Sequence, residues 1–233
     1  MNYGKKSVKQ KKKALQSTSS KLGRKCLLTF SKVLLLCVIA IGIIGICAGL
    51  GVFKGIIDSA PTITLEDATP TRYSSFIYDS KGNQMAKLIA EDSNRVPVTM
   101  DQIPTDLANA FVAIEDERFY QHNGIDIMGI LRAGVTAVKT GFKRQEGAST
   151  ITQQLIKNTV LTTWTQEKTL GERIKRKVQE QYLAIQLEKD TNDKSKILEQ
   201  YMNTINLGQN TLGVQAASKR YFNKNVWELS LSE

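Results

Sequence analysis

The feature of this sequence that most restricts its fold is an uncharged, apolar stretch at residues 33–53. A helix needs about 20 apolar residues to cross the hydrocarbon core of a bilayer, and this stretch is long enough. Lys32 and Lys54 flank it, where long basic side chains can reach the lipid headgroups. A cleaved signal peptide would have a shorter apolar core and a small-residue cleavage site. We therefore predict an uncleaved transmembrane anchor over residues 26–53.

The basic charge of the chain is concentrated ahead of this stretch. The formal net charge is +10, but residues 1–32 hold ten Lys and Arg and no acid, which leaves 22 basic against 22 acidic residues elsewhere. Because the remainder is neutral, no nucleic-acid partner is expected. A Lys/Arg cluster before a span favours a cytoplasmic N-terminus. Residues 1–25 are predicted to be a basic cytoplasmic tail without regular structure, and the residues after 53 are predicted to lie outside the cell.

A stalk and a β-hairpin are expected after the anchor. Residues 54–72 include two prolines and are interpreted as the stalk. Two short apolar runs, 73–78 and 85–89, flank a polar turn at residues 80–83. This pattern predicts an antiparallel hairpin with Gly82 in the turn.

From residue 103 onward the pattern is helical. Apolar residues recur at helix spacing in two places: Leu107, Ala110, Phe111 and Ile114, then Ile174, Val178, Leu183 and Leu187. The sequence thus predicts a mainly α domain over residues 73–233, α+β in class because of the hairpin. Residues 229–233 resemble the start of a further helix, so the domain is expected to be truncated at its C-terminus.

Three adjacent acids, Glu115, Asp116 and Glu117, stand where an apolar helix gives way to a glycine-containing turn. Acids at this end of a helix meet the unfavourable end of its dipole, so they do not serve helix stability. Carboxylates crowded beside apolar side chains suit a general base near neutral pH. The alternative is a solvated acidic cluster. His122, the single histidine, is interpreted as a turn-stabilising hydrogen bonder.

The segment 147–158 combines hydroxyl and amide side chains. Thr150 and Gln153 have capping-box spacing, so a helix is predicted to begin near Ser149 or Thr150. The free N–H groups at such a helix start favour an anion, and Lys157 falls one turn beyond Gln153 on the same face. A phosphate-bearing substrate would fit; an ordinary capped helix is the alternative.

A charged face follows in the next helical segment. Arg173, Arg176, Lys177 and Glu180 are spaced three and four residues apart and share one side of a helix. Such faces are ordinarily solvated ion-pair surfaces. A diphosphate leaving group, however, requires fixed cations that take up its developing charge.

In their order along the chain, these segments resemble glycosyltransferase family 51. That family includes monofunctional peptidoglycan glycosyltransferases and the polymerising domain of class A penicillin-binding proteins. The matching strings are Glu-Asp-x-x-Phe-x-x-His-x-Gly at 115–124, Gly-x-Ser-Thr-Ile-Thr-Gln-Gln at 147–154, Arg-Lys-x-x-Glu at 176–180 and, more loosely, Lys-x-x-x-Leu-Glu-x-Tyr-x-Asn at 194–203. Four ordered motifs make coincidence very improbable. The resemblance implies a lysozyme-like, mainly helical fold with a hydrophobic lobe that dips into the membrane, for which residues 125–142 are the candidate.

The resemblance also implies a reaction, the polymerisation of lipid II into glycan strands by inverting β-1,4 transfer with release of undecaprenyl diphosphate. Glu115 corresponds to the general base. Lys157, Arg176 and Lys177 correspond to positions that hold the diphosphate. Glu180 corresponds to a second functional acid, which either positions substrate or helps a divalent cation (Mg²⁺ or Mn²⁺) bridge the phosphates. Further substrate contacts are expected at Asp116, Ser149, Thr150, Gln153 and Gln154.

The expected partners are lipid II, the lipid-linked growing glycan strand, the membrane and other cell-wall synthesis proteins, with no organic cofactor. Two departures from the family pattern stand out: an extra turn at 171–175 before Arg176, and Asn223 where glycine is usual. Two alternatives stay open. One is a lysozyme-like enzyme that cleaves glycan, and the other is a catalytically idle, membrane-anchored scaffold fragment.

Overall fold

The computed structural model describes residues 4–15, 18–141, 143 and 147–233. The chain divides into two compact units, Met1–Gly55 and Ile56–Glu233. Phe142, which closes the predicted membrane lobe, lies outside the described residues.

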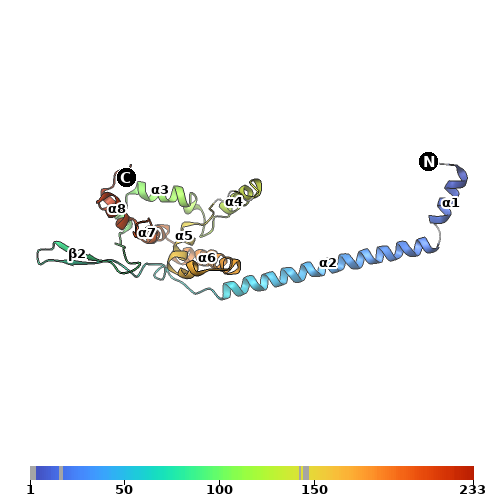
Figure 1. Ribbon diagram of the computed structural model, residues 1–233, viewed down its shortest axis with the longest axis horizontal. Helices are drawn as coiled ribbons and strands as arrows, with labels where there is room; N and C mark the ends of the chain where they lie inside the picture. Colours follow the sequence, from blue (N-terminus) through green and yellow to red (C-terminus); the bar gives the residue numbers. More distant parts are fainter. Residues whose placement is uncertain (1–3, 16–17, 142, 144–146) are drawn as a thin grey trace. The chain divides into compact units, whose positions relative to one another are not determined.

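The first unit is helical. Helix α1 spans Lys5–Leu15, and α2 runs as one uninterrupted helix over Thr18–Asp58 (Figure 1). The predicted lack of structure is wrong for α1, which contains no Gly or Pro and is rich in Lys, a good helix former. Within α2, the part Lys25–Asp58 contains an 18-residue window with a mean hydropathy of 3.0 and no buried residue, so its length and composition suit a membrane-spanning helix. The helix also continues into the segment that was interpreted as a stalk.

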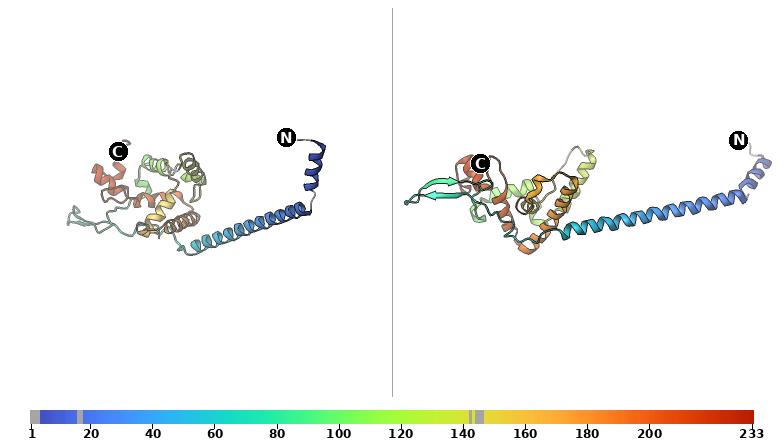
Figure 2. Two further views of the ribbon diagram at one scale, coloured as in Figure 1. Left: turned by 45° about the vertical axis from the view of Figure 1, so that its right-hand side comes forward. Right: turned by 60° about the horizontal axis from the view of Figure 1, so that its bottom comes forward.

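The predicted hairpin is present. Strands β1 (Ser75–Tyr78) and β2 (Gln84–Leu88) pair antiparallel, with Ser75 opposite Leu88 and an irregularity at Tyr78. Gly82 takes a positive φ of 83° in the turn, a conformation that glycine adopts without a Cβ clash. Both views of Figure 2 show the hairpin extending away from the helices of the second unit.

The rest of the second unit is mainly helical, as predicted. Its elements in chain order are η1 (Met100–Gln102), α3 (Thr105–Glu115), η2 (Phe119–Gln121), α4 (Ile127–Lys139), α5 (Ile151–Thr159), η3 (Thr162–Gln166), α6 (Leu170–Thr191), α7 (Lys194–Thr204), α8 (Val214–Phe222) and η4 (Val226–Glu228). Asn223 ends α8 with φ 54°, so this asparagine takes the left-handed conformation expected of the usual glycine. Residues 229–233 contain a turn but no helix.

Helix α5 lies at the centre of the core and packs against α6 and α7 (Figure 1). It buries five of its nine residues. Completely buried apolar side chains of α5, α6 and α7 form this part of the core: Leu155 and Ile156, Leu187, and Ile197, Leu198 and Met202. The start of α5 is thus anchored by buried residues, beginning with Ile151.

The buried face of α3 differs from the predicted one. Ala108 and Val112 are buried, whereas Ile114 is 81% exposed. Helix spacing was correct, but α3 packs on the core through a face rotated by about one residue. The end of α3 therefore remains accessible to solvent.

Candidate active site

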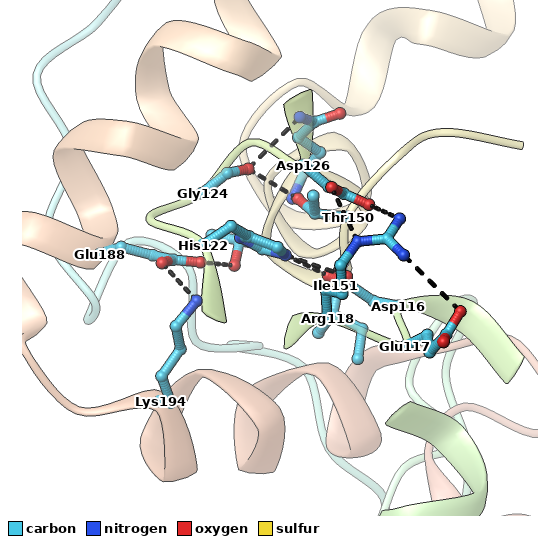
Figure 3. Close-up of polar contacts among 12 residues, drawn as sticks. Asp116, Glu117, Arg118, His122, Gly124, Asp126, Thr150, Ile151, Glu188 and Lys194 are labelled. Atoms are coloured by element: carbon cyan, nitrogen blue, oxygen red, sulfur yellow. Dashed lines mark hydrogen bonds and ion pairs between the residues drawn. The ribbon is translucent and has the colours of Figure 1, made fainter. Parts of the chain in front are cut away.

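Asp116 organises the interior of the site. Its carboxylate accepts a hydrogen bond from His122 Nε2 at 2.9 Å and another from the Ile151 N–H at 3.0 Å (Figure 3). An acid at the start of α5 is stabilised by the free N–H groups and by the helix dipole. The Asp116 side chain is only 2% exposed. Asp116 thus has an internal structural role and also lines the cavity beside Glu115, and its predicted substrate contact stays a prediction. The hydrogen-bonding role predicted for His122 is confirmed.

Gly124 forms the second part of this interior frame. Its carbonyl oxygen accepts hydrogen bonds from Thr150 Oγ1 at 2.8 Å and from Gln153 Nε2 at 3.3 Å. A Cβ at Gly124 would lie 2.6 Å from the backbone of Ala184, and its φ is 88°, so only glycine fits. Thr150 also caps α5 by accepting from the Gln153 N–H, as the capping spacing predicted. Both side chains are buried, and Thr150 also lines the cavity beside Glu115; the substrate contacts predicted for Thr150 and Gln153 stay predictions.

Glu115 is the accessible acid of the cluster. It is the last residue of α3, and its side chain is exposed. Its Oε2 accepts a hydrogen bond of 2.9 Å from Gln154 Nε2. The other end of that amide, Gln154 Oε1, accepts from the Tyr201 hydroxyl at 3.2 Å. Glu115 thus has a neutral partner and an open approach from solvent.

A cavity of about 120 Å³ links Glu115 to the cationic helix. Glu115 and Ser149 both line it. Ser149 Oγ accepts from Lys177 Nζ at 2.7 Å, and the same ammonium lies 2.7 Å from Glu180 Oε2. Through Ser149, the lining of the cavity that holds Glu115 is thus connected to Lys177 and Glu180 of α6.

Glu180 is completely buried at the centre of the cations. Its two oxygens pair with Arg176 and Lys177, which stand one helical turn before it. Arg176 also pairs with Glu167 through its Nε at 2.6 Å. A solvated ion-pair surface is thus the wrong description of this face, because Glu180 fixes two cations from inside the protein.

Lys157 is a third cation near Glu180, in addition to Arg176 and Lys177. Its Nζ lies 3.8 Å from the centroid of the Trp164 ring, close enough for a cation–π interaction. Burial lowers the pKa of Lys157, and the charge of nearby Glu180 partly opposes that change. Lys157, Arg176 and Lys177 therefore form one group of cations around Glu180.

The extra turn at 171–175 begins α6 early. Thr169 caps the helix and forms a reciprocal capping box with Glu172, whose carboxylate accepts from two backbone N–H groups. These hydrogen bonds, led by the one from Thr169, lower the pKa of Glu172. The added turn thus supplies its own cap and leaves Arg176 and Lys177 in place beside Glu180.

Two buried interactions were not predicted from the sequence. Glu188 accepts hydrogen bonds from Thr152 and from Lys194 Nζ, and Lys194 lies 4.5 Å from the centroid of the Phe119 ring. Their spacing in the sequence carries no signal, because Thr152 lies in another helix from Glu188. The second interaction, Arg118 with Asp126 at 2.6 Å, holds the start of α4.

The described residues do not form a metal site of their own. Within these ranges no group of three or more His, Cys, Asp or Glu side chains could hold an ion. Both oxygens of Glu180 are already paired with cations. A dedicated divalent site held by the described residues alone therefore does not fit.

An accessible carboxylate lines a cavity whose Ser149 is hydrogen-bonded to Lys177, one of the cations grouped around Glu180, and this arrangement suits sugar transfer from a diphosphate carrier. Residues 81–233 match the family described as Transglycosylase, and the chain belongs to this family. The chain thus carries a domain of the transglycosylase family, which agrees with the family that the motifs predicted, and the hydrolase and idle-scaffold alternatives are not favoured.

Three similar proteins share the name Penicillin-binding protein 1A. The protein of Clostridium botulinum strain Hall is 47% identical over 186 residues, which cover 78% of this chain and 21% of the relative. That of Clostridium perfringens strain ATCC 13124 is 40% identical over 228 residues, covering 97% of this chain and 26% of the relative. That of Aquifex aeolicus is 46% identical, covering 72% and 22%. The chain spans about a fifth to a quarter of the length of these relatives.

Proposed function

We propose that this chain polymerises lipid II into glycan strands, with Glu115 as the general base. The observation that carries the proposal is the cavity shared by Glu115 and Ser149, with Lys177 and Glu180 directly behind Ser149. A base and a cationic leaving-group site must lie on opposite sides of the reacting carbon for transfer with inversion.

The steps follow from these positions. Glu115 takes the proton of the acceptor's 4-hydroxyl, and that oxygen attacks the anomeric carbon of the donor. The bond from this carbon to the diphosphate breaks, and its electron pair leaves with the diphosphate. Lys157, Arg176 and Lys177 stabilise the resulting negative charge electrostatically. Diphosphate is a good leaving group without a strong acid, so a single base together with cations suffices, whereas a glycosidase uses two carboxylates.

The membrane positions this reaction. We propose that α2 crosses the bilayer with the N-terminus in the cytoplasm, which places the enzyme domain on the outer face. The positive charge of residues 1–32 supports this orientation. Helix α4 supports contact with lipid, because Ile127, Met128, Leu131, Val135 and Val138 are all more than half exposed. A lipid-linked substrate would then reach Glu115 with its tail still in the bilayer.

The test is to incubate the detergent-solubilised chain with labelled lipid-linked disaccharide-pentapeptide, in parallel with Glu115→Gln. Polymer should form with the parent, and the rate of the variant should fall about 10²- to 10⁴-fold, the range for loss of a general base. Circular dichroism checks that both are folded. Polymer formation at equal rates by both proteins would show that Glu115 is not the base.

A divalent cation bound jointly with the substrate phosphates is part of the same proposal. Mg²⁺ commonly binds through one or two carboxylates together with substrate phosphates. Adding EDTA, then restoring Mg²⁺ or Mn²⁺, should abolish and restore polymer formation. Undiminished activity in EDTA would remove the cation from the proposal.

A further inference from the structure

A chain of two hydrogen bonds connects the exposed base to a buried tyrosine. Tyr201 in α7 donates its hydroxyl proton to Gln154 Oε1 at 3.2 Å, and Gln154 Nε2 donates to Glu115 Oε2 at 2.9 Å. The three residues come from α7, α5 and the end of α3. The side-chain amide of Gln154 on α5 thus connects Tyr201 on α7 to the Glu115 carboxylate at the end of α3.

The tyrosine determines which end of the Gln154 amide faces Glu115 in this pair of hydrogen bonds. Burial raises the pKa of Tyr201, and the negative charge of Glu115 raises it further, so the hydroxyl stays protonated in the working range. A protonated hydroxyl directed at the amide donates to its oxygen. The NH₂ end of Gln154 must then face Glu115, whereas a free glutamine amide could turn either end towards it.

Packing holds the tyrosine in this position. Tyr201 has no exposed surface. Its ring packs edge-on against Phe111, with the centroids 6.1 Å apart and an interplanar angle of 81°. Phe111 stands one helical turn before Glu115 on α3. The ring therefore cannot swing away without disturbing the helix that carries the base.

We propose that Tyr201 is a positioning residue for the transfer reaction: it orients the Gln154 amide so that its NH₂ group is directed at the Glu115 carboxylate. The inference rests on the proposed role of Glu115 as the base. A hydrogen bond donated to a carboxylate favours its ionised form, which is the form that accepts a proton. When the hydroxyl is lost, Gln154 can turn its oxygen towards Glu115, and this orientation favours the protonated, inactive carboxyl.

Other charges also face the base and must stay constant in the test. Asp116 and Glu117 lie on the same turn, and Arg118, Asp126 and Arg132 line the cavity beside Glu115. Tyr201 is the titratable group on α7 that acts on Glu115. Because Tyr201→Phe leaves all the others in place, a change in the pH profile reports on the hydroxyl alone.

The experiment measures kcat/KM for polymer formation from below the ordinary pKa of a glutamate, about 4.3, up to about pH 9, so that the acidic limb is covered. The proteins compared are the parent, Tyr201→Phe, Gln154→Ala and the double variant. Tyr221→Phe is the matched control, since its hydroxyl also makes a single hydrogen bond, to the Leu207 carbonyl at 2.8 Å, but lies on α8. Thermal unfolding checks that each variant is folded.

Tyr201→Phe should lower kcat/KM about 3- to 10-fold on the acidic limb, the effect of one hydrogen bond, with much less change at high pH. In the Gln154→Ala background the same substitution should have no further effect, because the tyrosine acts through the amide. Tyr221→Phe should match the parent throughout. An equal loss at every pH, or an equal loss in both backgrounds, would overturn the proposal.

A second readout does not depend on turnover. The side-chain NH₂ signals of ¹⁵N-labelled Gln154 should shift as Glu115 is titrated, and the shift should disappear in Glu115→Gln. The shift should shrink in Tyr201→Phe and stay unchanged in Tyr221→Phe. If the parent makes no polymer, the proposed function fails while this measurement still decides the orientation of the amide. An undiminished shift in Tyr201→Phe would overturn the inference.

Discussion

The end of α3 and the middle of α6 each present a functional glutamate, and the two are held in opposite ways. Glu115 is exposed, and a neutral amide is its hydrogen-bond partner. Glu180 has no exposed surface and is paired with two cations. The site therefore combines an accessible acid with a buried one.

The difference follows from what each acid must do. A group that accepts a proton in every cycle must be reachable by substrate, and a strong ion pair would hold it in the charged form. An acid that keeps cations in place for a diphosphate gains from burial, since the pairing is stronger away from water. In the proposed reaction, exposure of Glu115 and ion pairing of Glu180 would thus serve different steps.

The largest expected effect comes from exchanging each acid for its amide. Glu180→Gln leaves Arg176 and Lys177 without their buried partner and should lower the free energy of unfolding by about 2–3 kcal/mol; the loss is reduced because Lys177 is 44% exposed and Arg176 keeps Glu167. Glu115→Gln should change stability by no more than about 0.5 kcal/mol, as for most surface substitutions. Urea denaturation of both variants measures the contrast. Equal losses would contradict the division into a buried and an accessible acid.

A second test concerns the frame beneath Glu115. Gly124→Ala places a methyl group 2.6 Å from the Ala184 backbone and should destabilise the fold by about 1–3 kcal/mol beyond the effect of the positive φ itself. Gly82→Ala is the matched control, since its φ is similar but its Cβ would meet no atom within 4 Å. Thermal unfolding compares the two variants. If their losses are the same, close packing does not hold the frame.

The smallest expected effect is a pH dependence of stability at Asp126, a carboxylate whose exposure lies between that of Glu115 and that of Glu180. The hydrogen bond from Arg118 lowers the pKa of Asp126, whose side chain is 14% exposed. A carboxyl with a lower pKa in the folded state adds stability above its unfolded pKa, and this stability is lost as pH falls through the folded value. Asp126→Asn should therefore lower the Tm by a few degrees at pH 6. The difference from the parent should shrink towards pH 3, and a constant difference would exclude the ion pair as its source.

Local patterns in the sequence were sufficient for several elements. The uncharged run at 33–53 lies within α2, the turn at Gly82 joins β1 to β2, and Thr150 caps α5. Each depends on residues within a few positions of one another, so spacing alone carries the information. The order of the four motifs likewise identified the family.

The role of each side chain was decided by tertiary contacts. Sequence spacing could not tell that Asp116, Thr150 and Gln153 turn inwards while Glu115 remains exposed, because burial depends on segments that meet from 26 to 39 residues away. Nor could it pair Tyr201 with Gln154, whose helices meet only in the folded core. The sequence by itself determined most of the elements of the second unit, the long apolar helix and the family, but not α1 or the helical start of the expected stalk. Only the packing of α3, α5, α6 and α7 decided which polar groups are buried as a frame and which face substrate, since burial is a property of the assembled chain.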